Sequence, residues 1–276
     1  MSEVTGRLGK NVQGYYGERI DIARVTRECR MAAEKSGWRV EPLQVSEKIE
    51  LLTLFRPAAG SVEHPFRLYI SAGIHGDEPA GPMAALQLLL DNFWPPEMEL
   101  WLCPCLNPTG FVLNRRENEA GTDLNRQYLE PTEPETLAHI AWLNRQPSFD
   151  LCLCLHEDWE SHGFYVYELN PDARPSLAEL MVKRVADVCP IDPSEIIEGR
   201  PAQQGIIRPS IDPRSRPQWP EAFFLLSYKT RLSYTLEAPS DFPLPTRVAA
   251  LAAGVRAAIK GSRQGDEDSF QGAGRA

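Results

Sequence analysis

The sequence lacks the features that would assign it to a membrane, secreted or repeat class. None of its 276 residues lies in an apolar run approaching the roughly 18 residues that a membrane-spanning helix needs. The charges of residues 1–20 are not followed by the apolar segment of a secretion signal. No repeat of fixed period and no Gly/Ser-rich linker divides the chain. We therefore expect a cytoplasmic, single-domain protein without a membrane partner.

Basic charge is also scarce. Lys and Arg number 29 against 38 Asp and Glu, which gives a formal net charge of −9. Binding to nucleic acid needs a basic face that neutralises phosphates, so we expect no nucleic-acid partner. Hydrophobic residues make up 42% of the chain, enough for a sizeable core.

The six cysteines are spaced as strand residues. Cys103 and Cys105, and likewise Cys152 and Cys154, lie two positions apart inside apolar runs, where a free thiol behaves as a small hydrophobe. A four-cysteine zinc site typically has two to four residues between paired ligands, which argues against a metal site here. Disulfides are not expected in a reducing compartment. The cysteines therefore predict core positions.

Strand-like and helix-like runs alternate along the chain, which predicts an α/β fold with a mixed, mostly parallel sheet and helices on both faces. The predicted strands are 49–56, 66–74, 100–106, 149–155, 163–169 and 231–237. The predicted helices are 19–36, 79–92, 134–145, 175–188 and 243–260. Residues 191–220, rich in proline and arginine, predict a long loop that is either a substrate wall or a plain surface loop. We expect the domain to cover 1–260 and the polar segment 261–276 to be a disordered tail.

A His-x-x-Glu pair follows the second of these strands. His75 and Glu78 lie in the H-G-D-E turn directly after the apolar run 66–74, where ligand sites of α/β sheets gather. An imidazole and a carboxylate at this spacing suit one small cation. The pair alone also fits a surface turn whose side chains face water.

Residues 107–128 form a polar loop that carries two arginine clusters. Arg115 and Arg116 belong to the first cluster, and Asn125 and Arg126 to the second. Guanidinium groups bind carboxylates bidentately, and an amide adds a donor, so the loop suits an anion. A solvated turn is the other interpretation.

Two further candidates end strands. His156 follows the apolar run 149–155, as His75 follows its own strand, and neighbouring parallel strands would bring both imidazoles to one edge of the sheet. Glu237 ends a β-prone run just before Pro239. Taken singly, a hydrogen-bonded structural histidine and a surface glutamate remain open.

In this order, the segments resemble the zinc carboxypeptidases of the carboxypeptidase A type and their relatives, the succinylglutamate desuccinylase and aspartoacylase group. The matching pieces are H-G-D-E (75–78), N-P-x-G (107–110), D-L-N-R (123–126), the strand-end His156 and T-L-E-A-P (235–239). The resemblance covers about residues 66–260. It implies a twisted sheet of about eight strands with one Zn²⁺ at its carboxyl edge.

The resemblance implies that His75, Glu78 and His156 are the zinc ligands, in the His₂Glu arrangement of catalytic zinc. Such zinc lowers the pKa of its water from 15.7 to roughly 7 and polarises the substrate carbonyl. Glu237 matches the family's general base.

The resemblance also assigns roles in the arginine loop. Arg116, seven positions before Asp123, matches the carbonyl-polarising arginine, which leaves Arg115 as a neighbour. Asn125 and Arg126 match the pair that holds the terminal carboxylate of the substrate. The family's mobile tyrosine has no decided counterpart, because the spacing does not choose between Tyr228 and Tyr234.

Three functions follow. The first is a zinc metallocarboxypeptidase that hydrolyses the C-terminal amide bond of a peptide, with a peptidoglycan-derived peptide as one candidate. The second is an N-acyl amino acid deacylase of the succinylglutamate desuccinylase/aspartoacylase type. The third is a catalytically silent module that binds carboxylate-bearing peptides. In each case the partner carries a free carboxylate.

Overall fold

The computed structural model describes residues 18–60, 62–210 and 212–272, with 264–272 described by their helical backbone. Ten strands in these ranges form one sheet, in the order β1-β2-β4-β3-β5-β10-β6-β9-β8-β7. The strands are β1 (Arg39–Gln44), β2 (Glu50–Arg56), β3 (Phe66–Ala72), β4 (Met98–Cys103), β5 (Leu151–Asp158), β6 (Tyr165–Leu169), β7 (Ile196–Ile197), β8 (Arg200–Gln203), β9 (Ile206–Ile207) and β10 (Ser233–Pro239).

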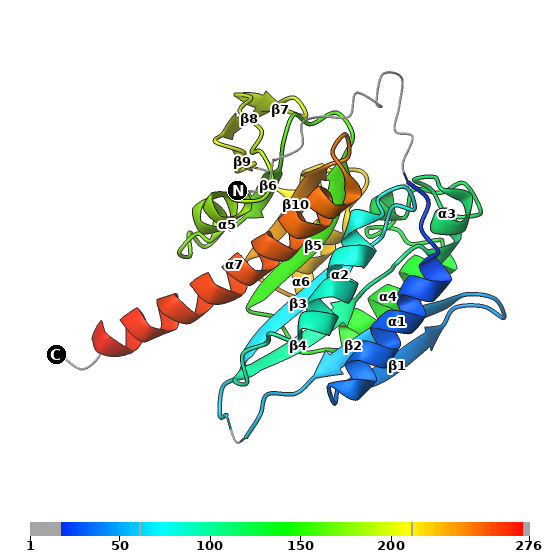
Figure 1. Ribbon diagram of the computed structural model, residues 1–276, viewed down its shortest axis with the longest axis horizontal. Helices are drawn as coiled ribbons and strands as arrows, with labels where there is room; N and C mark the ends of the chain where they lie inside the picture. The colour runs from blue at the N-terminus through cyan, green and yellow to red at the C-terminus, as the bar shows by residue number, and fades with distance from the viewer. Residues whose placement is uncertain (1–17, 61, 211, 273–276) are drawn as a thin grey trace.

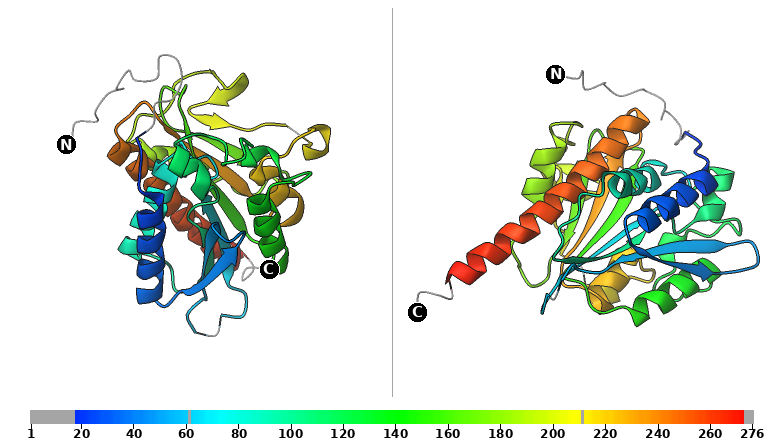
Figure 2. Two further views of the ribbon diagram at one scale, coloured as in Figure 1. Left: turned by 90° about the vertical axis from the view of Figure 1, so that its right-hand side faces the viewer. Right: turned by 60° about the horizontal axis from the view of Figure 1, so that its bottom comes forward.

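Helices cover both faces of this sheet (Figures 1 and 2). The helices are α1 (Ile22–Lys35), α2 (Ala80–Asp91), α3 (Pro108–Leu113), α4 (Pro134–Arg145), α5 (Ala178–Val185), α6 (Glu221–Tyr228) and α7 (Leu244–Gly272), with short 3₁₀ turns η1 (Leu124–Arg126) and η2 (Pro213–Ser215). Helices α1, α2, α5 and α7 bury one apolar cluster against the sheet. Helices α4 and α6 bury a second cluster on the other face.

The sheet is parallel at its centre and antiparallel toward its edges. Strands β4, β3, β5 and β10 run parallel to one another, whereas β2 joins β4, and β6 joins β10, in the antiparallel sense. All eight residues of β5 are buried, since a central parallel strand is covered on both faces. The carboxyl ends of β3, β5 and β10 therefore share one edge, as the strand-end residues predicted.

The predicted α/β class, single domain and two-sided helix cover are confirmed, but the strand count is ten rather than eight. The sheet is mixed rather than mostly parallel, because the four central strands and the β6–β9 pair are parallel while the other five neighbouring pairs are antiparallel. Much of the excess lies in 191–220, where we predicted a loop and the structure has β7, β8, β9 and η2. These strands are two to four residues long, too short for an apolar alternation to be visible in the sequence.

The boundary at residue 260 and the disordered segment after it are not what the structure shows, because α7 continues to Gly272. The first residues of this continuation belong to the domain. A Cβ added at Gly261 would lie 2.8 Å from Cδ2 of Leu177, so the helix packs closely there. The Ser262 hydroxyl donates to the carbonyl of Ile259, and Arg263 pairs with Glu97 at 2.7 Å. Residues 273–276 lie outside the described part of the chain.

Within the described ranges, each helix is too short or too polar to traverse a lipid bilayer. All six cysteines are buried and free.

A buried ion pair ties the end of β5 to the surrounding helices. The Glu157 carboxylate accepts hydrogen bonds from Nη1 of Arg247 at 2.5 Å, from the Ser240 hydroxyl at 3.0 Å and from the backbone N–H of Ala80 at 2.5 Å. Arg247 also bonds to Glu18. These contacts join β5 to the start of α2 and to α7, directly beside His156.

We expect Arg247→Ala to lower the free energy of unfolding by about 3–5 kcal/mol, because it leaves the Glu157 charge buried and unpaired. Urea unfolding followed by circular dichroism measures the change. The double variant Arg247→Met/Glu157→Gln removes both charges and should lose less stability than the single variant. An equal or larger loss in the double variant would contradict this explanation.

Candidate active site

The candidate residues come from three neighbouring central strands and the turns that follow them. His75 and Glu78 lie between the end of β3 and the start of α2, and His156 lies in β5. Glu237 on β10 stands directly opposite His156 in the parallel β5–β10 register. Because β5 pairs with both β3 and β10, the sheet places all four residues at its carboxyl edge.

The turn that carries His75 is packed against the loop that carries Arg116. A Cβ added at Gly76 would lie 2.0 Å from the backbone carbon of Gly110, so the two loops meet where only glycine fits. The Asn107 amide donates to the carbonyls of Ile74 and Arg116, both at 3.1 Å. Gly76 of the H-G-D-E segment and Gly110 of the N-P-x-G segment therefore allow the two loops to approach each other closely.

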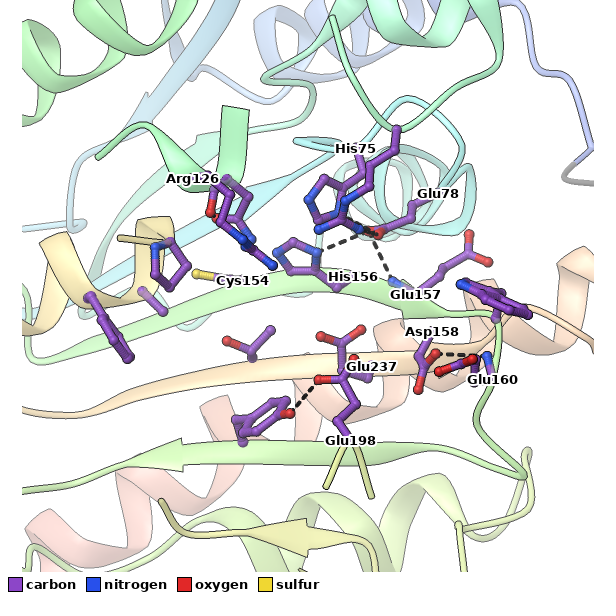
Figure 3. A pocket seen from close by; sticks show the side chains of 18 of the residues that line it. His75, Glu78, Arg126, Cys154, His156, Glu157, Asp158, Glu160, Glu198 and Glu237 are labelled. Atoms are coloured by element: carbon purple, nitrogen blue, oxygen red, sulfur yellow. Dashed lines mark hydrogen bonds and ion pairs between the residues drawn. The ribbon is translucent and has the colours of Figure 1, made fainter. Parts of the chain in front are cut away.

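His75, Glu78 and His156 converge on one point (Figure 3). Nδ1 of His75 lies 2.5 Å from Oε1 of Glu78, and Nδ1 of His156 lies 3.0 Å from Oε2. Potential ligand atoms of all three lie within 4.8 Å of one another, and all three residues are buried. Among the described residues this is the only group of three or more His, Cys, Asp or Glu side chains with such spacing.

The hydrogen-bonding arrangement of His75 fits a bound cation. Its buried Nε2 lies 3.4 Å from Oδ1 of Asp123 and makes no hydrogen bond. If neutral His75 carries its proton on Nδ1, it donates to Glu78, but its unprotonated Nε2 then faces the Asp123 carboxylate. If the proton is on Nε2, the unprotonated Nδ1 faces the Glu78 carboxylate. A cation at Nδ1 resolves this conflict, because Nε2–H then faces Asp123, the usual outer partner of a ligating histidine.

Two carboxylates of the site, those of Glu78 and Glu237, favour opposite protonation states. Burial alone would raise the pKa of Glu78, but the imidazoles of His75 and His156 lower it below its usual range. Burial raises the pKa of Glu237 well above its usual range, and the nearby carboxylates of Glu78, Glu198 and Asp158 raise it further. Glu78 is thus held as an anion between two imidazoles, while Glu237 favours its protonated form.

Arg116 reaches this site and Arg115 does not line the pocket. Nε of Arg116 donates to Oδ2 of Asp123 at 2.9 Å, and its Nη1 lies 3.8 Å from Oε1 of Glu78. Arg115 instead donates to the carbonyl of Asn118. Asp123 therefore orients both Arg116 and His75.

Asn125 and Arg126 lie in the same pocket. The side-chain amide oxygen Oδ1 of Asn125 accepts a hydrogen bond from the backbone N–H of Glu221 at 2.8 Å, which fixes the Asn125 side chain against the start of α6. Arg126 is exposed, and its only described hydrogen bond is from Nη1 to the carbonyl of Asn125 at 2.8 Å. Its guanidinium is free to bind an anion.

A cavity of about 530 Å³ joins the metal-ligand candidates to both arginines and to Glu237. It also brings in residues that sequence reasoning did not place at the site, among them Cys154, Asp158, Glu160, Tyr167, Glu198 and Thr235. Cys154 and Asp158 lie two positions before and after His156, and the period of two along a strand could have identified them. Glu198 lies in the predicted loop, where no sequence signal marked it.

The other candidates lie elsewhere. Tyr234 is fully buried and donates to Glu168, whereas Tyr228 is exposed and contacts Trp219 and Phe224 with tilted rings; neither lines the cavity. Of the loop arginines, Arg208 pairs with Glu168 and Arg214 with Asp212. Arg200 and Arg216 line the cavity. The long segment is therefore a wall of the pocket.

Comparison with known sequences gives two partial matches. The family model of the succinylglutamate desuccinylase/aspartoacylase catalytic domain matches residues 66–188. Carboxypeptidase SOL1 of Arabidopsis thaliana is 33% identical over 122 residues, which are 37% of this chain and 24% of SOL1. The matched stretch thus spans about a quarter of the length of that curated relative.

Solved structures cover far more of the chain. A Shewanella amazonensis protein provisionally named a metallopeptidase is 27% identical with a TM-score of 0.74, over 87% of this chain and 92% of that one. A metallo-carboxypeptidase from Pseudomonas aeruginosa, solved with (2-guanidinoethylmercapto)succinic acid, is 23% identical with a TM-score of 0.66, over 91% of this chain and 71% of that one. The second likeness concerns the fold alone.

The fold and the partial sequence matches are those of carboxypeptidase-like hydrolases. The chain resembles the carboxypeptidase-like proteins, and its residues 66–188 match the succinylglutamate desuccinylase/aspartoacylase catalytic domain. The resemblance stated from the ordered motifs is confirmed.

Metal content tests the ligand assignment. We expect His156→Ala to lose at least tenfold in Zn²⁺ affinity, because one of three ligand atoms is removed. Equilibrium dialysis followed by elemental analysis measures the bound metal. His162→Ala is the matched control, since His162 is exposed and does not line the cavity. Unchanged metal content in His156→Ala would show that the ligands are wrongly assigned.

Proposed function

We propose that this protein is a zinc-dependent metallocarboxypeptidase that hydrolyses the C-terminal amide bond of a peptide. The observation that carries the proposal is one cavity that holds the His75–Glu78–His156 group, Glu237 opposite it and the exposed Arg126 guanidinium. A metal-ligand group, a proton acceptor and an anchor for a terminal carboxylate are the parts that this reaction needs. A cytoplasmic location, supported by six free thiols, is part of the same proposal.

In this proposal, His75, Glu78 and His156 hold one Zn²⁺, and Glu237 is the general base. Zinc, when bound, lowers the pKa of a water molecule and polarises the scissile carbonyl. Glu237 accepts a proton from the attacking water and donates it to the leaving nitrogen. Its raised pKa suits the second step, in which the protonated group donates, whereas the first step needs the carboxylate form, which a bound cation would favour.

Arg116 and the clamp complete the proposed machinery. The Arg116 guanidinium, held by Asp123, donates to the oxygen that becomes negative when water attacks. Arg126 and Asn125 bind the terminal carboxylate and so place the last amide bond at the metal site. An internal peptide bond offers no carboxylate at this position, which favours removal of the C-terminal residue.

The second candidate is an N-acyl amino acid deacylase, favoured by the match of residues 66–188 to the desuccinylase/aspartoacylase domain. It uses the same base and metal ligands and differs in which side of the amide carries the anchoring carboxylate. The succinic acid derivative bound by the Pseudomonas aeruginosa enzyme is compatible with an anion clamp in either case. A silent binding module is disfavoured, because each position of the proposed machinery holds a residue capable of its step.

Glu237→Gln tests the proposed base. We expect the variant to keep its bound zinc but to lose about 10²–10⁴-fold in kcat, because glutamine cannot accept the proton. Release of leucine from a leucine-terminated peptide measures turnover, and dialysis measures metal. Glu119→Gln, at an exposed position that does not line the cavity, is the control. Near-normal turnover in Glu237→Gln would refute the assignment.

Arg126→Ala tests the clamp. We expect kcat/KM to fall by about tenfold or more for peptides with a free terminal carboxylate, because a charge-assisted hydrogen bond to that group is lost. C-terminally amidated peptides should be poor substrates of both proteins, with little further loss in the variant. The ratio of kcat/KM for the two substrate forms is the measurement, and equal losses on both would argue for a structural role of Arg126.

A further inference from the structure

The two ends of the cavity differ in charge. Cys154, His156 and Asp158 alternate along β5, so all three face the cavity. Cys154 pairs with Ser71, whose hydroxyl donates to Glu221, and the backbone N–H of Glu221 holds Asn125. The carboxylate clamp therefore lies at the Cys154 end, and Asp158 marks the opposite end. Figure 3 shows Arg126 and Cys154 on one side of His156, and Asp158 and Glu160 on the other.

This order sets which part of a substrate meets Asp158. At about 3.3 Å per strand residue, Asp158 lies roughly 7 Å beyond His156. A peptide held by its terminal carboxylate at the clamp, with its last amide at the metal site, extends its acyl portion toward Asp158. Two residues of extended chain span the same distance, so the amino group of a tripeptide reaches this end.

Glu198 joins Asp158 from a different part of the chain. It lies in the two-residue turn between β7 and β8, and its Oε2 accepts a hydrogen bond from the Tyr167 hydroxyl at 2.6 Å. Tyr167 pairs with Thr235, two residues before Glu237, so the Glu198 carboxylate is brought over the catalytic strand (Figure 3). The turn places Glu198 at φ 48° and Gly199 at φ 68°, a conformation that asparagine or glycine adopts more easily than glutamate.

The carboxylates at this end have no described cationic partner. Asp158 accepts hydrogen bonds from the Glu160 backbone N–H and the Tyr165 hydroxyl, and none of Asp158, Glu160 and Glu198 forms an ion pair with a described side chain. Arg200 and Arg216 also line the cavity but pair with none of these carboxylates. The acidic end is therefore available to a cation from outside the protein.

Resting on the proposed peptidase function, we propose that Glu198, together with Asp158 and Glu160, binds an ammonium group on the acyl side of the scissile amide. The substrate is then a short peptide with a free amino group about two residues before the scissile bond. An N-succinyl amino acid would place its acyl carboxylate against these three acids. Glu198 thus acts as the residue that selects for charge on the acyl side.

Three tripeptides that differ only in the amino-terminal group test this assignment. They are Ala-Ala-Leu with a free amino group, its N-acetyl form and its N-succinyl form; leucine is chosen because Leu169, Ala222 and Phe223 line the cavity. With zinc-loaded protein, we expect kcat/KM to be about two- to fivefold higher for the free than for the acetylated peptide, the range expected of one ion pair. The succinylated peptide should be the slowest.

Glu198→Gln should abolish the preference for the free amino group, measured as the ratio of kcat/KM for the free and acetylated peptides, because any effect of the lost charge on Glu237 acts on both peptides alike. Tyr167→Phe, which removes the hydroxyl that holds Glu198, should reduce the preference in the same direction. Arg200→Gln, on the same hairpin and of opposite charge, is the control and should not lower the preference, because it removes a positive charge near Tyr167. Equal losses on all three peptides in Glu198→Gln, or a wild-type preference for the succinylated peptide, would overturn the assignment.

Calorimetric binding of the same peptides to wild type and Glu198→Gln separates this inference from the proposed function, because it needs no turnover. Tighter binding of the free peptide that depends on Glu198, without release of leucine, would refute the peptidase and retain the ammonium site. Release of leucine with equal binding of free and acetylated peptides would retain the peptidase and refute the ammonium site.

Discussion

The arrangement of this protein depends on the carboxylate of Glu78 held between the Nδ1 atoms of His75 and His156. The two imidazoles come from segments about eighty positions apart, and they meet only because β3 and β5 pair in parallel and end at one edge. Three buried polar groups in contact are costly unless each is paired. The backbone N–H of Glu157 donates to Glu78, and the outer nitrogen of His75 lies 3.4 Å from Asp123 without a hydrogen bond. The tight glycine contact between the two loops serves the same end, because it holds Arg116 beside this cluster.

Two kinds of task are divided between two regions of the sheet. The metal-ligand candidates and Glu237 lie at the ends of central strands that are covered on both faces, so their positions are set by the core. The groups proposed to bind the two ends of a substrate come from peripheral segments. Asn125 and Arg126 lie in a 3₁₀ turn, and Glu198 lies on a short hairpin at the edge of the sheet. Buried strands give the chemistry its precision, whereas loops and edges face the substrate.

The sequence was informative where a motif or a long periodic run carried the signal. Helix 134–145 was predicted at its observed bounds, and the ordered motifs named the residues that the structure brings together at the cavity. Strand β1 was missed because Pro42 interrupts its pattern, which an edge strand tolerates. The continuation of α7 was missed because glycine and serine signal an end to a helix, whereas packing against Leu177 and the Glu97 pair extend it. Glu198 could not be found, because its position depends on a turn and on the Tyr167 hydroxyl, neither of which leaves a pattern in the sequence.

The match to the desuccinylase/aspartoacylase domain ends at residue 188, before both the β7–β8 hairpin and Glu237. The hairpin is joined to the sheet only through β9 and β6, so its length and composition can change without disturbing a buried strand. In proteins with this architecture, substrate preference can therefore diverge through changes in this peripheral hairpin, while the residues at the ends of the central strands stay the same. The same separation makes the β7–β8 hairpin suitable for exchange between proteins, because replacing its turn leaves the residues of the candidate site unchanged.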